Sequence, residues 1–333
     1  MEIERIFRDS RVRSVKIITA LCVILIFSAL ISVYLGAVKL TLLGAFDPSK
    51  RDILNLRLAR IILAILTGGG LSVVGVILQG LLRNPLCEPY VLGISSGASL
   101  GAVLAIVSGI NCAVLNFGAL PLFAFLGAAA ALFLVYRIAQ VNGRLPAQNL
   151  LLTGVVMGTV LSSIVILIIS FSQKETIHSV IWWMLGSLQI FDVRLLSLVG
   201  LAVLFGLACS FMFYRELNAI SLGEEEALHL GIDTERLKKY LFLTASLVTG
   251  AIVSVVGMIG FVGLIVPHFM RLIVGPDHKI LIPSSFLAGG IFLVVCDSIA
   301  RVAVAPSEIP AGAITAILGG VFFIYLLRRK SRI

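Results

Sequence analysis

Charged residues are scarce in this sequence. Asp, Glu, Lys and Arg make up 13% of its 333 residues, against about a quarter in a typical soluble domain. Hydrophobic residues make up 59% of the chain, and its mean hydropathy is +1.10. This composition excludes an ordinary soluble globular protein and is typical of a chain that lies mostly within a lipid bilayer.

The sequence motifs of the common enzyme classes are also missing. No GxxxxGK[ST] segment occurs, so the chain has no P-loop of its own for ATP. No GxSxG nucleophile elbow and no HExxH or HxxxH pair occur. Ser95 and Ser96 are followed by glycine and alanine, which suits close helix packing better than nucleophilic chemistry. We therefore expect no catalytic residues, no metal site and no cofactor.

The cysteines show neither a disulfide pattern nor a zinc-site pattern. None of the five forms a CxxC pair with another, and they are scattered along the chain. We interpret them as packing residues. They are Cys22, Cys87, Cys112, Cys209 and Cys296.

Long apolar runs dominate what is present. A run of about 18 or more such residues can cross a bilayer. The shortest of the runs is 261–274, and Pro267 predicts that it is tilted or broken. The first run is too long for a cleaved signal peptide and has no small-residue cleavage site after it. The ten candidates are 17–35, 58–82, 91–108, 119–136, 149–171, 195–213, 240–257, 261–274, 281–300 and 311–327.

These runs predict an all-α integral membrane protein with about ten transmembrane helices, forming one polytopic domain over residues 1–333. An even number of spans places both termini on one side. The termini and the even-numbered loops, with the adjoining span ends, hold 18 of the 26 Lys and Arg residues. Because basic residues favour the cytoplasmic side, we predict cytoplasmic N and C termini in a cell membrane. The net charge of +9 is thus a topology signal, and we expect no nucleic-acid partner.

One long polar segment, residues 218–233, has the pattern of a folded surface element. Gly223 can end one short helix and cap the next, and Gly231 can stop that second helix in a left-handed cap. Glu224–Glu226 fall in the first turn, where carboxylates favour the positive end of the helix dipole. Its apolar side is expected to comprise Ala227, Leu228 and Leu230. The segment suits a surface for another protein, although an ordinary capped loop helix remains the alternative.

Polar residues inside apolar runs are costly in lipid and usually face a partner or a pathway. Asp297 and Arg301 are four residues apart, so a structural pair on one helix is favoured. A proton-coupled carrier should have carboxylates near the centre of several spans, and Asp297 is the one candidate, near a helix end.

For Gln79 we expect a buried interhelical hydrogen bond. Arg57, Arg60 and Arg301 lie at predicted outer helix ends, where they either reach for lipid phosphates or form a basic cluster for an acidic partner.

Several of these motifs together resemble one protein family. Leu54–Ser99 is similar to the second span and following loop of permeases from the iron-siderophore, haem and vitamin B12 class of ABC importers, the type II importers. The resemblance rests there on Arg-x-x-Arg, a glycine-rich span, Gln, Asn-Pro-Leu-x-x-Pro and Leu-Gly-x-x-x-Gly-Ala. It extends to Trp182–Leu188, Gly260–Pro283 and Asp297–Gly320. Ala59 stands where the family usually has proline, which affects helix geometry only.

The resemblance implies a homodimeric permease with a pathway on its twofold axis, a cytoplasmic ABC ATPase dimer and an extracytoplasmic substrate-binding protein. ATP hydrolysis would belong to the separate ATPase, so the chain itself would not be an enzyme. The implied substrate is a metal chelate, iron-siderophore first and haem or cobalamin next. An ion-coupled secondary transporter is the alternative, and an intramembrane enzyme a third.

The resemblance also implies roles for individual residues. The cytoplasmic coupling segment 218–233 would meet the ATPase through Leu222, Gly223, Glu224, Glu225, Ala227, Leu228 and Gly231. The binding protein would dock on Arg57, Arg60 and Arg301. The cytoplasmic gate would contain Asn84, Leu86, Ala147 and Gln148.

Overall fold

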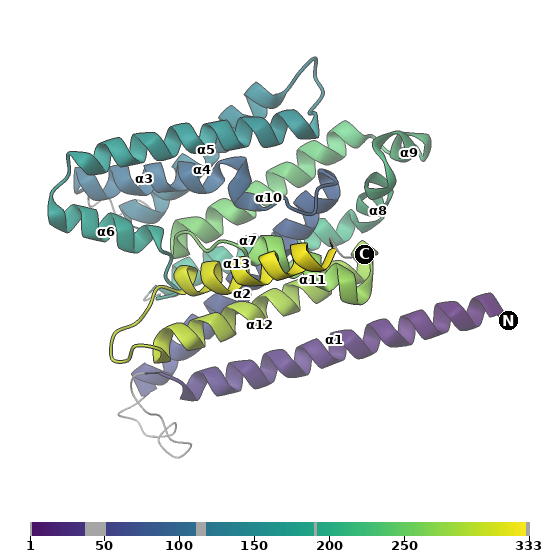
Figure 1. Cartoon of the computed structure of the whole chain (residues 1–333), viewed down its shortest axis with the longest axis horizontal. Helices are drawn as coiled ribbons and strands as arrows, with labels where there is room; N and C mark the ends of the chain where they lie inside the picture. The colour runs from purple at the N-terminus through teal and green to yellow at the C-terminus, as the bar shows by residue number, and fades with distance from the viewer. Residues whose placement is uncertain (1, 37–50, 111–117, 190–191, 331–333) are drawn as a thin grey trace.

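The computed structural model of the chain describes residues 2–36, 51–110, 118–189 and 192–330 (Figure 1). Across these ranges the regular structure is helical and no β-strand occurs, so the predicted all-α class is confirmed. Cys112, interpreted above as a packing residue, lies outside the described residues.

Within the described ranges, seven helices are long and apolar enough to cross a membrane. They are α1 (Glu2–Tyr34), α2 (Arg51–Leu81), α4 (Ala119–Ala139), α5 (Ala147–Ser170), α7 (Val193–Met212), α10 (Thr234–Val256) and α12 (His278–Val302). Three further helices correspond to the remaining predicted runs, namely α3 (Ile94–Ser108), α11 (Val262–Val274) and α13 (Ala311–Lys330), whose apolar part is Ala311–Ile324. Every predicted apolar run therefore falls on an apolar helix, while the number that span the bilayer stays a prediction.

Four short helical elements connect the long ones. They are the 3-10 turn η3 (Pro89–Leu92), α6 (Lys174–Met184), α8 (Tyr214–Leu222) and α9 (Glu224–His229). In Figure 1, α8 and α9 lie at the same end of the bundle as the start of α1 and the end of α13, whereas α6 lies at the opposite end. We refer to these as the α8–α9 end and the α6 end. The helix α6 was not predicted.

The core is built around α2, which is the most deeply buried of the long helices and packs against α12, α7 and α11. Glycines allow the close approach. A Cβ placed on Gly68 would lie 2.2 Å from the carbonyl oxygen of Gly289 in α12, and one on Gly75 would lie 1.9 Å from that of Gly263 in α11. Only residues without side chains fit at these crossings, which is the small-residue packing usual between membrane helices.

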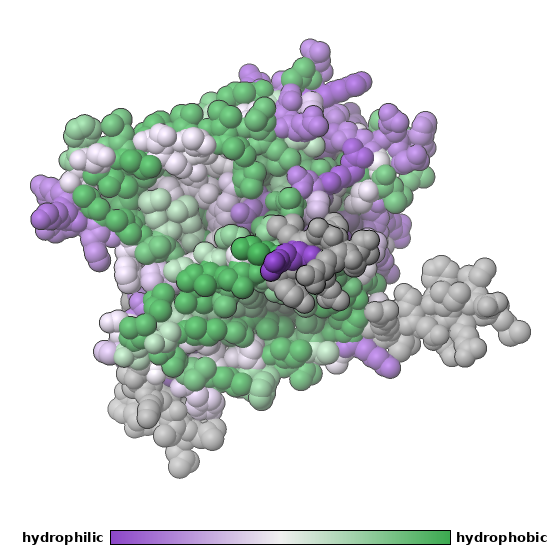
Figure 2. All heavy atoms as spheres, viewed as in Figure 1, coloured by the Kyte–Doolittle hydropathy of each residue, from purple (hydrophilic) through white to green (hydrophobic). Residues whose placement is uncertain are grey.

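The outer surface of the bundle is largely apolar. Figure 2 shows hydrophobic residues across the middle of the molecule and hydrophilic residues gathered toward the two ends. Helices α1 and α5 contribute much of this exposed apolar area, including Phe27 and Leu152. Such a band matches a surface that faces lipid or another membrane subunit.

The helix α11 corrects one expectation. Pro267 was predicted to tilt or break the eighth run. The helix is not broken, since α11 continues through the proline from Val262 to Val274, while its tilt stays a prediction. The proline has no N–H to donate to the carbonyl of Gly263, four residues earlier. Gln79 of α2 supplies the missing donor, since its Nε2 lies 3.3 Å from the Gly263 oxygen and 3.0 Å from that of Leu264. The helix is short because it begins only after a turn at Phe261, whose φ is 69°.

Candidate coupling and gating site

The local structure of residues 218–233 follows the predicted pattern. The helix α8 ends at Leu222 and α9 begins at Glu224, with Gly223 between them. Gly231 has a φ of 80°, its N–H donates to the oxygen of Leu228, and the N–H of Ile232 donates to that of Ala227. These bonds form a Schellman cap. The glycine spacing therefore predicted both boundaries of α9.

The apolar residues of α9 do not share one face, contrary to the single apolar side that was expected. Ala227 is fully buried against the core, whereas 56% of Leu228 and 68% of Leu230 are exposed. Leu222, at the end of α8, is 76% exposed. The buried alanine anchors the segment, and the exposed leucines leave an apolar surface beside charged residues. Such a surface suits contact with another protein better than contact with water.

A cleft of about 850 Å³ separates α9 from the start of α5. It brings the predicted gate residues Ala147 and Gln148 together with the predicted coupling residues Leu222 and Leu228. Arg83, which follows α2, also lines it. The remaining charged residues around the cleft are Arg144, Glu224, Glu225, Glu226, Glu235 and Lys238.

The other predicted gate residues form the turn that follows α2. The helix ends at Leu81, and Arg83 has a φ of 47°. The side-chain oxygen of Asn84 accepts from the N–H of Leu86 at 3.0 Å, and its carbonyl accepts from that of Cys87 at 3.1 Å. Asn84 thus shapes an Asx turn. Leu86 is 50% exposed at its tip.

The segment α8–α9 is tied to the bundle by polar contacts that the sequence did not reveal. Asn218 in α8 accepts from the backbone N–H of His278 at 2.8 Å and lies 2.7 Å from its Nδ1. The Asn218 amide also donates to Asp277 Oδ1 at 2.8 Å. The contacts join α8 to the first residues of α12, 60 positions away. Lys238 in α10 is also buried at this end, and the sequence analysis did not identify it as a site residue.

At the α6 end, the structure brings Arg60 and Arg301 together around Asp297. Arg60 Nη2 lies 2.8 Å from Asp297 Oδ1, and Arg301 Nε lies 3.0 Å from Asp297 Oδ2. The predicted helical pair between Asp297 and Arg301 is therefore confirmed. Arg60 makes a second ion pair with Glu308, at 2.7 Å, in the segment between α12 and α13.

These arginines do not form the exposed basic cluster that was expected. Arg57 is 8% exposed and Arg301 is 3% exposed. Arg57 Nη1 donates to the carbonyl of Val33 at 2.6 Å, and Arg301 donates to those of Ser32 and Leu35 at 3.2 and 2.9 Å. The guanidinium groups are thus turned inward, because carbonyls at the end of α1 and two carboxylates satisfy their donors. Docking of a binding protein on them stays a prediction.

The ion pair with Arg60 also shifts the acidity of Glu308. Partial burial acts to raise its pKa, but hydrogen bonds from Arg60 and Gln189 and the charge of Arg60 outweigh this effect. The pKa of Glu308 is therefore lower than its ordinary value of 4.5.

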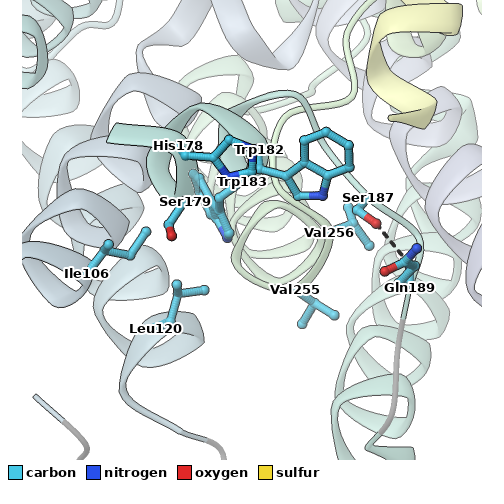
Figure 3. A pocket seen from close by; sticks show the side chains of 10 residues that line it. All are labelled: Ile106, Leu120, His178, Ser179, Trp182, Trp183, Ser187, Gln189, Val255 and Val256. Atoms are coloured by element: carbon cyan, nitrogen blue, oxygen red, sulfur yellow. Dashed lines mark hydrogen bonds between the residues drawn. The ribbon is translucent and has the colours of Figure 1, made fainter. Parts of the chain in front are cut away.

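A hollow of about 590 Å³ opens at the α6 end (Figure 3). The His178 and Trp182 rings stack in it with centroids 5.9 Å apart, and the N–H of Gln189 donates to the hydroxyl of Ser187. The Gln189 amide also donates to Glu308 Oε2 at 2.9 Å, which connects the rim of the hollow to the arginine pairs. Among the described residues, no group of three His, Cys, Asp or Glu side chains could hold a metal ion.

One half-buried carboxylate escaped the sequence analysis. Glu88 follows the turn after α2, and its Oε2 accepts from the N–H of Phe261 at 3.3 Å. Nearby, the Tyr90 hydroxyl donates to the carbonyl of Ile259 at 2.7 Å and accepts from its N–H at 2.8 Å. These bonds hold the loop before α3 against the turn before α11. Nothing in the local sequence pattern indicates which turn would receive them.

Comparison with known proteins agrees with this architecture. The sequence profile of the FecCD transport family matches residues 23–329. The chain is 44% identical to the cobalamin import system permease protein BtuC of Halobacterium salinarum, over 83% of this chain and 73% of that protein. It is 34% identical to the hemin transport system permease protein HmuU of Yersinia pestis, over 97% of this chain and 98% of that protein.

A solved structure shows the same fold. Its title describes an inward-facing conformation of a metal-chelate type ABC transporter; the TM-score is 0.83 at 30% identity, covering 95% of this chain and 99% of that one. The profile match spans nearly the whole chain, and the apolar helices carry the expected multi-pass pattern. The chain therefore belongs to the FecCD transport family and is a multi-pass permease of the cell membrane.

Proposed function

We propose that the chain is the membrane subunit of an ATP-binding-cassette importer and forms the translocation pathway for a metal chelate. Its family and the import systems named for its relatives support this proposal. Iron-siderophore complexes rank first from the sequence resemblance. Haem and cobalamin, which correspond to the names of the two relatives, come next.

The α8–α9 end is the proposed cytoplasmic end, with both termini on that side. The charge asymmetry of the sequence supports this orientation. A separate ATPase subunit would dock on α8 and α9, and it would hydrolyse the ATP, since this chain has no P-loop. The observation that carries this assignment is the exposure of Leu222 and Leu228 on a capped, anchored helix pair beside the cleft.

Two further parts of the proposal concern the other surfaces. The chain would pair with a second copy, so that the turn around Leu86 and the start of α5 at Gln148 approach their symmetry mates at the cytoplasmic mouth. The binding protein would dock at the α6 end. Because Arg60 is already paired with Glu308, an acidic side chain of the binding protein would have to compete with Glu308 for that arginine.

The ion-coupled alternative gains no support from the geometry of Asp297. This carboxylate is 1% exposed and lies within 3.0 Å of both Arg60 and Arg301. Each of its two oxygens faces an arginine, so the carboxylate is the centre of an ion-pair network that links α2 to α12. This arrangement is that of a structural ion pair, which was the role favoured for Asp297 and Arg301 from their spacing.

Co-purification with the ATPase subunit tests the proposed docking surface. The double variant Leu222→Glu/Leu228→Glu replaces two exposed apolar side chains by charges, and we expect it to insert normally but to lose the ATPase. The matched control is Glu226→Lys, which changes an exposed charge on the same helix outside the predicted contact residues and should cost little. Retention of the ATPase by the double leucine variant, at the wild-type ratio, would contradict the assignment.

A further inference from the structure

Lys238 is a buried cation at the α8–α9 end. It lies in the second turn of α10, and its side chain is 3% exposed, whereas its neighbour Lys239 is exposed. A buried ammonium group is costly unless it is paired. Lys238 has two such partners, because its Nζ lies 2.7 Å from Glu224 Oε2 and 3.1 Å from Glu235 Oε1.

The two carboxylates lead to different parts of the chain. Glu224 is the first residue of α9. Glu235 lies in the first turn of α10, and its second oxygen accepts from the backbone N–H of Leu145 at 2.9 Å. Leu145 is buried and stands two residues before Ala147, where α5 begins. A continuous path of charged hydrogen bonds thus joins α9, through Lys238 and Glu235, to the start of α5.

This path has little freedom to rearrange. Pro146 fixes one backbone angle between Leu145 and α5. Ala227 holds the other end of the path against the core. If Glu224 moved away alone, Lys238 would keep Glu235 but lose the nearer of its two partners inside the protein, which is unfavourable for a buried ammonium group. Displacement of α9 should therefore carry Lys238 and the turn at Leu145 with it.

We propose that Lys238 is a positioning residue that transmits movement of α9 to the start of α5, where Ala147 and Gln148 lie. The inference rests on the proposed docking of an ATPase on α8 and α9. A bound ATPase biases two conformations only through contacts that differ between them. The Lys238 path provides a physical connection by which such a bias reaches the cytoplasmic gate.

If Lys238 only stabilised the fold, its replacement would lower stability without changing how α9 and the start of α5 move. Pulsed electron paramagnetic resonance separates these roles. The permease–ATPase complex would carry spin labels in a cysteine-depleted background, either at Glu226→Cys and Lys279→Cys or at Gln148→Cys and Lys279→Cys. The first pair reports movement of α9 relative to α12, and the second reports movement of the start of α5. All three labelled positions are exposed.

In the otherwise unchanged chain, we expect ATP to shift both distances. In Lys238→Met, ATP should still shift the distance from Glu226 to Lys279. The population in which ATP shifts the distance from Gln148 to Lys279 should drop roughly tenfold, which is within the usual range for coupling between two sites. The matched control Lys239→Met should keep both shifts. The variant Lys238→Arg, which keeps the charge, should restore part of the Gln148 shift.

If Lys238→Met fails to fold, the triple variant Lys238→Met/Glu224→Gln/Glu235→Gln removes the uncompensated carboxylates and should fold, yet still lose the Gln148 shift. A full Gln148 shift in either variant would overturn the role of Lys238 while leaving the docking proposal intact. If ATP moves neither label in the unchanged complex while the ATPase stays bound, this inference falls, whereas the docking proposal falls only if co-purification fails to depend on Leu222 and Leu228.

Discussion

The side chain of Gln79 in α2 donates to the carbonyl of Gly263 in α11, 184 residues away in the sequence. That carbonyl lacks its helical partner because residue 267 is proline. The Oε1 of Gln79 in turn accepts from Arg271 Nη1 at 3.0 Å. One buried amide therefore completes a proline-containing helix and fixes a basic side chain one turn further on.

Replacing this amide should destabilise the bundle locally. We expect Gln79→Leu to lower the free energy of unfolding by about 1–3 kcal/mol, the usual cost of leaving buried polar groups unsatisfied. Thermal or denaturant unfolding in detergent measures it. The companion variant Pro267→Ala restores the missing N–H, so the double variant should lose less than the sum of the two single changes. Strict additivity would show that Gln79 does not compensate for the proline.

The depressed pKa of Glu308 predicts a pH-dependent contribution to stability. A carboxyl whose pKa is lower in the folded state stabilises the fold above its unfolded-state value and loses that contribution as the pH falls through the folded-state value. Glu308→Gln should therefore be less stable than the unchanged chain at neutral pH, by at most about 1 kcal/mol because Glu308 is partly exposed. The difference should shrink below pH 4.5, the ordinary pKa. Melting curves across this range measure it, and a constant difference would contradict the ion pair.

The segments that were predicted well depend on short-range rules. Gly223 and Gly231 set the boundaries of α9 through local backbone geometry, and Asp297 meets Arg301 because residues four apart share a helix face. The apolar runs located the long helices because membrane length and hydropathy are themselves sequence properties.

What escaped prediction depends on how distant helices are rotated against each other. Arg60 was expected to point outward, but its main partner, Asp297, lies 237 residues away. Lys238 is three residues from Glu235, a spacing that hints at a pair, yet its contact with Glu224 arises only once α9 folds back onto α10. The helix α6 was missed because it is short and mixed in polarity, so it has no membrane-span signal.

The proposed homodimer predicts a crosslink at the cytoplasmic mouth. With native cysteines replaced, Leu86→Cys should form an intersubunit disulfide in a closed state and less of it in another nucleotide state. The control Leu201→Cys, 70% exposed on α7, tests whether exposure alone suffices. Non-reducing gels measure the dimer fraction. Equal crosslinking of the two variants, or none at Leu86→Cys under any nucleotide condition, would argue against a gate at this turn.

The central claim is that ATP drives import through this chain, and uptake by reconstituted vesicles tests it most directly. The permease, its ATPase and its binding protein would be reconstituted together and supplied with a radiolabelled iron-siderophore, haem or cobalamin. We predict uptake of at least one of these chelates that requires hydrolysable ATP, persists when an ionophore collapses the ion gradients, and is lost in Leu222→Glu/Leu228→Glu. Uptake by the permease alone, driven by a proton or sodium gradient and indifferent to ATP, would contradict the account.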